Sequence, residues 1–551
     1  MTETPFIPSA PSAHVDDFAR RHLPPPEMQP RFSYDFPPPL SQYAARINVA
    51  TELLDKKAAK HPDKPAIIFE GGSWSYAGLL KRANRIARVL VHRLGVRPGN
   101  RVLIRAPNNP AYAACWLAIQ KVGAICVATM PLLRARELAF IGEKAQVDFA
   151  LCDHRLLEEM EAAREKSGHF GTICTFTPLL EGELGRYMEA EDDDFENIAT
   201  AADDVCLIAF TSGTTGDPKG CMHFHRDVMA ICDTFSRYVL KPRADDIFAG
   251  TPPLAFTYGL GGLLIFPLHA GAATVLLEKF TPETMQQAIQ DFRISVFVTA
   301  PTAYRTMLAT GGDYDLSSLR ECMSAGETLP RATWEAWYEA TGVRIIDGIG
   351  ATEMLHIFIA SAREDIRPGS TGLPVPGYEA RVVDEAGNEC PPGTVGRLAV
   401  RGPTGCRYLD NPEKQRDYVR DGWNYTGDSY LMDEDGYFWY QARTDDMIIS
   451  AGYNISGPEV EAVLLEHEAV AECAVIAAPD AARGSIVKAF IVLKAGVRGD
   501  EALVKALQDH VKNTIAPYKY PRAIAFLDAL PKTQTGKIQR FILRQREWEG
   551  L

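Results

Sequence analysis

The sequence predicts an α/β protein of at least two domains, in which parallel sheets are covered by helices. Short β-rich apolar runs alternate with helical runs along most of the chain. The 551 residues, 46% of them hydrophobic, are too many for one compact core and too apolar for a disordered chain. After Asp428 the pattern changes to short hairpin-like pieces and then to a compact tail, which indicates a second, smaller domain.

The alternation predicts individual elements in chain order. The expected strands are 101–105, 124–128, 205–210, 273–277, 296–299 and 344–347, and the expected helices are 111–122 and 134–145. In the tail we expect strands at 474–476 and 488–493 and a helix with one apolar face at Leu503, Val504, Leu507 and Val511. The charged stretch 443–446 separates two β-rich blocks, so we expect domains at 1–444 and 445–551.

Composition excludes several classes of function. The chain has 58 basic and 71 acidic residues, a formal charge of -13 that repels phosphate backbones and anionic lipids. We therefore expect no nucleic-acid and no membrane partner. The most apolar long stretch, 260–277, contains Pro267 and His269 and fits a buried segment better than a membrane span. Eleven cysteines without a C-x-x-C pair indicate reduced, buried thiols in a cytoplasmic protein.

The strongest local signal is the segment 211–220, which follows the predicted strand 205–210 directly. Its glycines let the backbone approach oxygen atoms closely, so its N–H and hydroxyl groups can surround a polyphosphate. It is not a Walker A loop, because Pro218 precedes Lys219 and Gly220 follows it. The residues expected to bind phosphate are Thr211, Ser212, Gly213, Thr214, Thr215, Gly216 and Lys219.

This loop resembles the signature loop of the adenylate-forming superfamily of acyl-CoA synthetases, peptide-synthetase adenylation domains and luciferases. Five more stretches are similar to family motifs in the family's order: 324–327, 350–353, 425–428, 443–446 and 531–537. The resemblance covers roughly residues 45–545. It implies a large amino-terminal domain of two sheets plus a β-barrel-like subdomain, followed by a small mobile α+β carboxy-terminal domain.

The resemblance also implies roles for single residues in activating a carboxylate with ATP. Such a reaction brings two anions together, so its site needs cations and hydrogen-bond donors around the phosphates. Glu353 is expected to hold Mg²⁺ and Thr352 to donate to the α-phosphate. Asp428 is expected to accept the ribose hydroxyls and Arg443 to reach the ribose or a phosphate, while Lys537 brings a positive charge during adenylation. The other nucleotide contacts implied are Ala325, Gly326, Glu327, Asp347 and Gly348.

In the second half-reaction the acyl group passes to a thiol. In the family the small domain rotates about a hinge aspartate, here Asp445, and brings a glycine-containing loop, here with Gly452, towards the thiol. Ala451 departs from the commoner serine before that glycine, which leaves its tunnel contact open. The chain stops at Leu551 soon after the lysine motif, so we expect no fused carrier domain and free coenzyme A as the acceptor. A homodimer stays an open alternative.

Stretches 12–16, 256–261 and 347–358 resemble the benzoate and 2-aminobenzoate branch of the aryl-CoA ligases. The resemblance implies a flat, mostly apolar slot for one aromatic ring. The implied slot residues are Thr257, Tyr258, Ala325, Gly350 and Ile357, with His356 either lining the slot or lying behind it. We expect 2-aminobenzoate as the best substrate because the Thr257 hydroxyl can pair with an ortho amine, and benzoate or another small aromatic acid as the alternative.

Three other interpretations of the sequence are a metal site, a dinucleotide site and a regulator without catalysis. His223 and His225 have the spacing of two ligands on one strand face, but no third ligand follows in a metal-binding pattern. The glycines at 259–262 match only part of a dinucleotide fingerprint. A remote alternative for the whole chain is a nucleotide-binding regulator that has lost catalysis.

Overall fold

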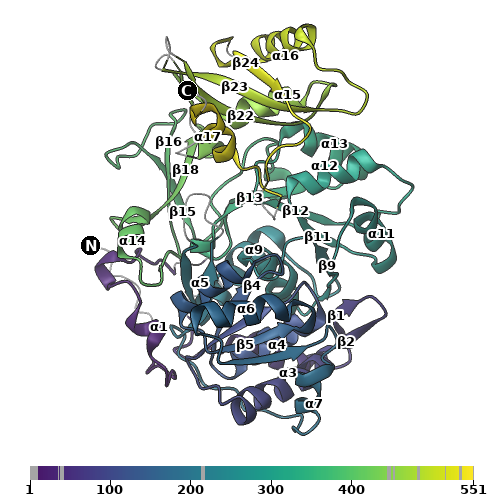
Figure 1. The fold of residues 1–551 in the computed structure, drawn as a ribbon, viewed down its shortest axis with the longest axis vertical. Helices are drawn as coiled ribbons and strands as arrows, with labels where there is room; N and C mark the ends of the chain where they lie inside the picture. Colours follow the sequence, from purple (N-terminus) through teal and green to yellow (C-terminus); the bar gives the residue numbers. More distant parts are fainter. Residues whose placement is uncertain are drawn as a thin grey trace.

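The computed structural model describes residues 10–34, 36, 43–211, 218–443, 448–450, 453–480, 484–515, 517–532 and 536–549. Two mixed sheets with covering helices and a third, antiparallel sheet form the large part of the molecule, up to Arg443. A smaller α/β part follows and lies at the top in Figure 1. The α/β class expected from the sequence, with a separate small carboxy-terminal domain, is confirmed.

The first sheet has six strands in the order β6-β5-β3-β4-β7-β8, all parallel except β8 at the edge. Its inner strands are buried on both faces, which explains why the sequence shows unbroken apolar runs there. The strands are β3 (Arg101–Arg105), β4 (Ile125–Thr129), β5 (Phe149–Asp153), β6 (Thr172–Phe176), β7 (Val205–Phe210) and β8 (Gly220–Phe224).

The second sheet has eight strands in the order β14-β13-β12-β11-β9-β10-β1-β2, with antiparallel strands at both edges. Its parallel strands end at one edge, where the loops after β12 and β13 lie side by side. The strands are β1 (Pro65–Phe69), β2 (Gly72–Ser75), β9 (Ile247–Gly250), β10 (Ala273–Val275), β11 (Val296–Thr299), β12 (Glu321–Ala325), β13 (Ile345–Gly350) and β14 (Ile357–Ala360).

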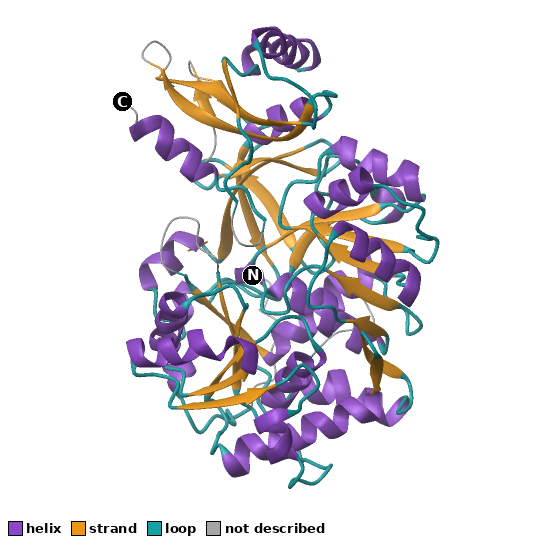
Figure 2. Ribbon diagram, turned by 45° about the vertical axis from the view of Figure 1, so that its right-hand side comes forward, coloured by secondary structure: helices purple, strands orange, loops and turns teal. Residues whose placement is uncertain are grey.

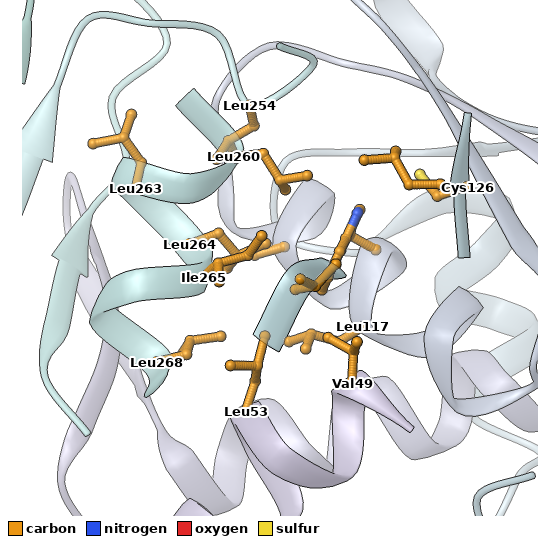
Figure 3. Close-up of a cluster of buried hydrophobic side chains, with 14 of the residues drawn as sticks. Val49, Leu53, Leu117, Cys126, Leu254, Leu260, Leu263, Leu264, Ile265 and Leu268 are labelled. Atoms are coloured by element: carbon orange, nitrogen blue, oxygen red, sulfur yellow. The ribbon is translucent and has the colours of Figure 1, made fainter. Parts of the chain in front are cut away.

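The main core lies among helices associated with these two sheets. All twelve residues of α4 (Pro110–Lys121) are buried, as expected for a helix that is apolar on every side. Figure 3 shows Leu117 of α4 facing Val49 and Leu53 from one segment and the leucines of 254–268 from another. This packing accounts for the apolar stretch 260–277 as buried core, and within the described residues no helix is long and apolar enough to cross a membrane.

The large part contains further helices. They are α1 (Phe18–Arg21), α2 (Lys56–Lys60), α3 (Tyr76–Arg88), α5 (Ala135–Ala145), α6 (Leu157–Ser167), α7 (Gly182–Met188), α8 (His225–Ile231), α9 (Thr257–Leu260), α10 (Phe266–Ala270), α11 (Pro282–Phe292), α12 (Pro301–Thr310), α13 (Arg331–Thr341) and α14 (Pro412–Tyr418). Some are packed on the sheets and others, such as α8 and α10, are buried in the core.

The third sheet is antiparallel, with β15 (Glu379–Val383), β16 (Gly396–Arg401), β17 (Val419–Arg420), β18 (Trp423–Met432) and β19 (Phe438–Arg443). The amino-terminal segment runs beside it, where Arg31 N–H donates to Gly422 O at 2.8 Å and Ser33 N–H to Gly402 O at 3.0 Å. This sheet ends at Arg443, and the expected domain boundary at 444/445 lies outside the described residues.

The carboxy-terminal part is built on a sheet of β22 (Val470–Asp480), β23 (Gly484–Leu493) and β24 (Ala523–Phe526) beside the hairpin β20 (Ile448–Ser450) and β21 (Tyr453–Ile455). Alternate residues of β22 face opposite sides: Val475 packs towards α15 (Gly457–Leu465) and α16 (Glu501–Thr514), and Ile476 towards α17 (Arg540–Glu549). Figure 2 shows helices on both sides of this sheet.

Most expected elements of the large part are confirmed to within one or two residues, and β3, β7 and β11 have the expected bounds. The tail strands expected at 474–476 and 488–493 are longer, because β22 and β23 pair over 470–480 and 484–493. The expected strand 273–277 is shorter, because only residues 273–275 form the parallel ladder with β9 and β1. The expected strand 344–347 continues to Gly350, paired there with β14. All eleven cysteines are free thiols and all but Cys390 are buried, as the sequence predicted.

Candidate active site

The segment 211–220, which is expected to bind phosphate, connects β7 and β8. Thr211 N–H donates to Lys219 O at 2.9 Å, and Lys219 N–H donates to the Thr211 hydroxyl at 3.3 Å. These two bonds join Thr211 and Lys219 at the base of the loop, so the residues that flank it are held side by side. The expected contacts Ser212, Gly213, Thr214, Thr215 and Gly216 lie outside the described residues.

The 3-10 turn η7 (Thr352–Met354) follows β13 and carries the expected magnesium ligand. Glu353 is buried, and its Oε1 accepts a hydrogen bond from the Tyr408 hydroxyl at 2.5 Å. Burial, together with the Glu353 carboxylate, raises the pKa of Tyr408, so the phenol stays protonated and donates. The Lys219 ammonium lies 5.2 Å from the Tyr408 ring centroid, which brings the phosphate-loop lysine close to the same carboxylate.

No motif or periodic pattern of the sequence points to Tyr408. The structure places it through an isolated bridge between Cys221 of β8 and Tyr408, with Leu409 N–H donating to Gly220 O at 2.8 Å. A tyrosine 55 residues from its carboxylate partner leaves no periodic signal in the sequence. Pairing of this segment with β8 was therefore needed to find it.

His223 and His225 do not form a metal pair. His223 Nε2 bonds to Thr352 O at 2.8 Å, whereas His225 Nδ1 accepts from Val49 N–H at 3.3 Å. Among the described residues no group of three His, Cys, Asp or Glu side chains can hold a metal. Each histidine instead has its own backbone partner.

The loop after β12 and the end of β13 form the expected adenine side. Ala325 and Gly348 are partners in the parallel ladder, as are Ser324 and Asp347. Gly326 follows with φ +89, a left-handed conformation that favours glycine. A Cβ on Gly348 would lie 2.8 Å from the Ile357 side chain, so this position has no room for one.

Asp347 is an unusual carboxyl group in this wall. Burial raises its pKa to about 8. Its Oδ1 is buried and has no hydrogen-bond partner within the part of the chain that the structure describes. The group is therefore largely protonated at neutral pH and available for a polar contact.

Asp428 and Arg443 face one another on neighbouring strands. They are register partners of β18 and β19, and Arg443 Nη1 lies 3.0 Å from Asp428 Oδ1. The Asp428 carboxylate raises the pKa of the guanidinium. Asp428 is buried while the Arg443 side chain is 53% exposed, so the arginine is the partner with freedom to move.

Lys537 reaches this site from the carboxy-terminal part. Its Nζ lies 3.9 Å from the position of a Cβ built on Gly326. Partial desolvation and the nearby Arg443 guanidinium lower the pKa of the Lys537 ammonium, and the carboxylates of Glu327 and Asp428 oppose that shift. The structure thus brings Lys537, Glu327, Asp428 and Arg443 into one charged group. The expected hinge residue Asp445 and the loop residue Gly452 lie outside the described residues.

The residues expected to line the acid slot lie among aromatic rings. Thr257 is buried at the start of α9, and the next residue, Tyr258, donates its hydroxyl to Thr299 O at 3.0 Å. The His356 ring centroid lies 5.7 Å from that of Tyr258 and 4.6 Å from that of Phe266. His356 therefore touches Tyr258 directly, which favours a place in the wall of the slot.

The His356 imidazole is buried with both nitrogens lacking hydrogen-bond partners among the described residues. Burial lowers its pKa to about 3, so the ring is neutral. A Cβ on Gly261 would lie 2.3 Å from the imidazole, and one on Gly350 would lie 2.9 Å from the His356 carbonyl. Gly261 thus makes room for the ring, whereas Gly259 and Gly262 are packed against Pro253 and Val298. Ile357 is buried in β14.

The leader stretch 12–16 has a different place. Ala13 N–H donates to Asp204 Oδ2 at 2.9 Å, and Asn100 donates to Asp16 Oδ2 at 2.9 Å. These contacts attach the leader to the six-stranded sheet region. The resemblance at residues 12–16 therefore concerns the packing of the amino terminus and gives no information on the acid slot.

Comparison with known proteins agrees with this arrangement. The AMP-binding enzyme family matches residues 54–407, and the AMP-binding enzyme C-terminal domain matches residues 459–537. The chain belongs to the AMP-binding enzyme family, in the adenylate-forming superfamily, and is an AMP-forming acid–thiol ligase.

Two of the similar proteins are named as ligases of aromatic acids, and a third is named only as MatB. A benzoate–CoA ligase of Thauera aromatica is 38% identical over 92% of this chain and 97% of its own length. A crystal structure of an anthranilate CoA ligase in complex with anthranoyl-AMP superposes with a TM-score of 0.88 at 36% identity, covering 92% of this chain and 98% of that one. An ATP-bound MatB from Rhodopseudomonas palustris has a TM-score of 0.80 at 30% identity, covering 91% and 98%.

Proposed function

We propose that this chain activates 2-aminobenzoate with ATP and transfers the acyl group to coenzyme A. An aryl-CoA ligase is supported by the benzoate–CoA and anthranilate–CoA ligases to which the chain is similar over nine-tenths of its length. The proposal includes a cytoplasmic role in aromatic compound degradation. The observation that carries the choice of acid is a buried threonine, Thr257, next to the ring wall formed by Tyr258 and His356.

The first step joins two anions. A carboxylate oxygen of the acid attacks the α-phosphorus, the new O–P bond forms, and the bond to pyrophosphate breaks. The Thr352 hydroxyl donates to the α-phosphate, and the Lys537 ammonium offsets charge on the acid and on the same phosphate. Lys219 and the loop Thr211 to Gly216 surround the departing phosphates.

The second step replaces AMP by a thiol. The coenzyme A thiol gives its proton to water and its sulfur attacks the carbonyl carbon of the acyl-adenylate. The C–S bond forms, and AMP leaves with the electron pair of the C–O bond. Asp445 serves as the hinge for the domain movement, and Gly452 lines the approach of the pantetheine arm.

Glu353 fits a magnesium ion carried by the nucleotide. Mg²⁺ commonly binds through one or two carboxylates plus substrate phosphates and waters, and the described residues around η7 offer one buried carboxylate and no closed cage. When bound, Mg²⁺ would neutralise charge on the phosphates. Tyr408 keeps Oε1 of Glu353 in place by donating to it at 2.5 Å.

The nucleotide contacts are part of the same proposal. Asp428 accepts the ribose hydroxyls once Arg443 turns towards the phosphates. Ala325, Gly326, Glu327, Asp347 and Gly348 form the adenine side. There the largely protonated Asp347 can donate to a ring nitrogen as well as accept from the exocyclic amine.

Recognition of the ortho amine is assigned to Thr257. Its hydroxyl makes no hydrogen bond to another residue in the part of the chain that the structure describes, so an amine at the ring edge can be its partner. One neutral hydrogen bond contributes about 0.5–1.5 kcal/mol, or roughly a tenfold preference. The slot residues Tyr258, Ala325, Gly350 and Ile357 supply the apolar surface for the ring itself.

Specificity constants for 2-aminobenzoate and benzoate test the proposal. The wild type should prefer 2-aminobenzoate about tenfold, and Thr257→Val should lose that preference because valine keeps the shape without the hydroxyl. Thr257→Ser is the matched control and should retain most of the preference. A wild type that prefers benzoate, or an unchanged ratio in Thr257→Val, would assign the enzyme to benzoate or another small acid. If neither acid supports AMP release from ATP, the result would favour the alternative that the chain is a nucleotide-binding regulator without catalysis.

A further inference from the structure

A chain of buried polar groups leads from the centre of the large domain to the η7 turn. Arg407 Nη1 donates to Asp227 Oδ2 at 2.7 Å, and that oxygen lies 3.9 Å from His223 Nδ1. On its other side, His223 Nε2 bonds to Thr352 O at 2.8 Å. All three side chains are fully buried, and they come from β8, α8 and the segment before α14.

The partner of His223 fixes its tautomer. A carbonyl oxygen only accepts hydrogen bonds, so Nε2 must carry the proton that it donates to Thr352 O. Nδ1 finds no hydrogen-bond partner among the described residues, since 3.9 Å to Asp227 is too long for one. The imidazole therefore has one directional bond, and it is the bond to the η7 turn.

The ring has little freedom to leave this position. β8 pairs with β7, where His223 lies opposite Leu207. Asp227 also accepts from Phe224 N–H at 2.9 Å, and the Arg407 guanidinium lies 3.9 Å from the Phe224 ring centroid. An amino-terminal ring, Phe32, lies 4.2 Å from the same guanidinium. These contacts hold Asp227 and Arg407 rigidly behind the histidine.

We propose that His223 is a positioning residue that holds the η7 turn in place for magnesium-bound ATP. It touches Thr352 through the backbone carbonyl, while Tyr408 holds the side chain of the next residue, Glu353. The two bonds fix the turn at two adjacent residues. The inference rests on the proposed function in one respect, that Thr352 and Glu353 meet the phosphates and their metal.

Two amide substitutions separate the bond from the bulk of the side chain. In His223→Gln the terminal NH₂ reaches about as far as Nε2 and can donate to Thr352 O. In His223→Asn it stops near the position of Nδ1 and cannot. His223→Leu removes the donor at similar volume. MgATP affinity, measured by calorimetry without any acid, and the Mg²⁺ concentration for half-maximal pyrophosphate exchange are the readouts.

We expect His223→Asn and His223→Leu to weaken MgATP binding about tenfold and to raise the Mg²⁺ requirement about tenfold, in the range typical of residues that orient a metal ligand. His223→Gln should stay within about threefold of wild type. His225→Leu is the control, because it also removes a fully buried histidine with a backbone partner. It should lower Tm without changing the Mg²⁺ requirement.

Folded Asn and Leu variants with wild-type MgATP affinity would overturn the inference. So would a Gln variant as weak as the Asn variant, or a His225→Leu control with the same rise in Mg²⁺ requirement. A wild-type protein that does not bind MgATP would instead contradict the proposed function itself. The two failures are therefore distinguishable.

Discussion

The two sides of the nucleotide site are held in different ways. On one side, η7 is attached to the core by His223 and by Tyr408, both buried. On the other side, Arg443 is the last residue before the undescribed segment 444–447, and Lys537 comes from the carboxy-terminal part. The first side is fixed by buried hydrogen bonds, whereas on the second side Lys537 of the carboxy-terminal part lies near the carboxylates of Glu327 and Asp428.

The difference separates two tasks. A turn that binds metal-bound phosphates gains from a rigid position, since no free energy is then spent on ordering it during the reaction. A lysine that serves one half-reaction must be able to leave. Charge pairs between parts of the chain allow such exchange more readily than a buried hydrogen bond does.

The fixed side depends most strongly on a buried ion pair. Arg407→Leu should lower the free energy of unfolding by about 3–5 kcal/mol, because it leaves the Asp227 carboxylate buried without its partner. Urea denaturation measures this. The double variant with Asp227→Asn should recover a substantial part of the loss. A loss below about 1 kcal/mol in the single variant would show that the fixed side does not depend on this pair.

The second side of the site is tested by substituting Lys537. Lys537→Ala should slow adenylation by about 10²–10³, since one charge near the reacting phosphate is lost. Transfer to coenzyme A from acyl-adenylate supplied in advance should be largely spared. Pyrophosphate exchange and single-turnover thioester formation measure the two steps. An equal loss in both would contradict the assignment of Lys537 to one conformation.

A substitution at the expected hinge tests whether the carboxy-terminal part that carries Lys537 moves. Asp445→Pro fixes φ and should prevent the backbone rotation, so transfer to coenzyme A falls about tenfold or more while adenylation stays nearly intact. The matched control Asp445→Ala keeps a free φ and should be much less affected. Steady-state turnover unchanged by the proline would place the hinge elsewhere.

A smaller effect concerns pH. Burial raises the pKa of Asp347 in the folded protein to about 8. Between the usual pKa of a carboxyl group and pH 8, the native protein therefore holds one more proton than the unfolded chain. Stability should therefore fall as pH rises through this window, by up to about 1.4 kcal/mol per pH unit. Tm measured from pH 5 to 8 should fall less in Asp347→Asn. Parallel curves for the two proteins would show that Asp347 is not protonated.

Regular elements were predictable because their signal is local. The unbroken apolar runs of β3 and β7 and the apolar circumference of α4 reflect burial on every side, which the sequence shows directly. Strand ends were less certain, and residues 276–277 fell outside β10 because pairing with neighbours sets where a ladder stops. The glycines at 259–262 were explained only by their close neighbours in the fold, which are Pro253, the His356 imidazole and Val298.

The sequence by itself determined the class of fold, the charge balance that disfavours nucleic acids, and the ordered motifs that supply the site residues. Only the tertiary structure decided which side chains support those motifs. Tyr408 meets Glu353 and His223 meets Thr352 across 55 and 129 residues, and no periodicity links such positions. Local patterns record burial along one element, whereas hydrogen bonds between elements depend on how the sheets pack, which is a property of the whole chain.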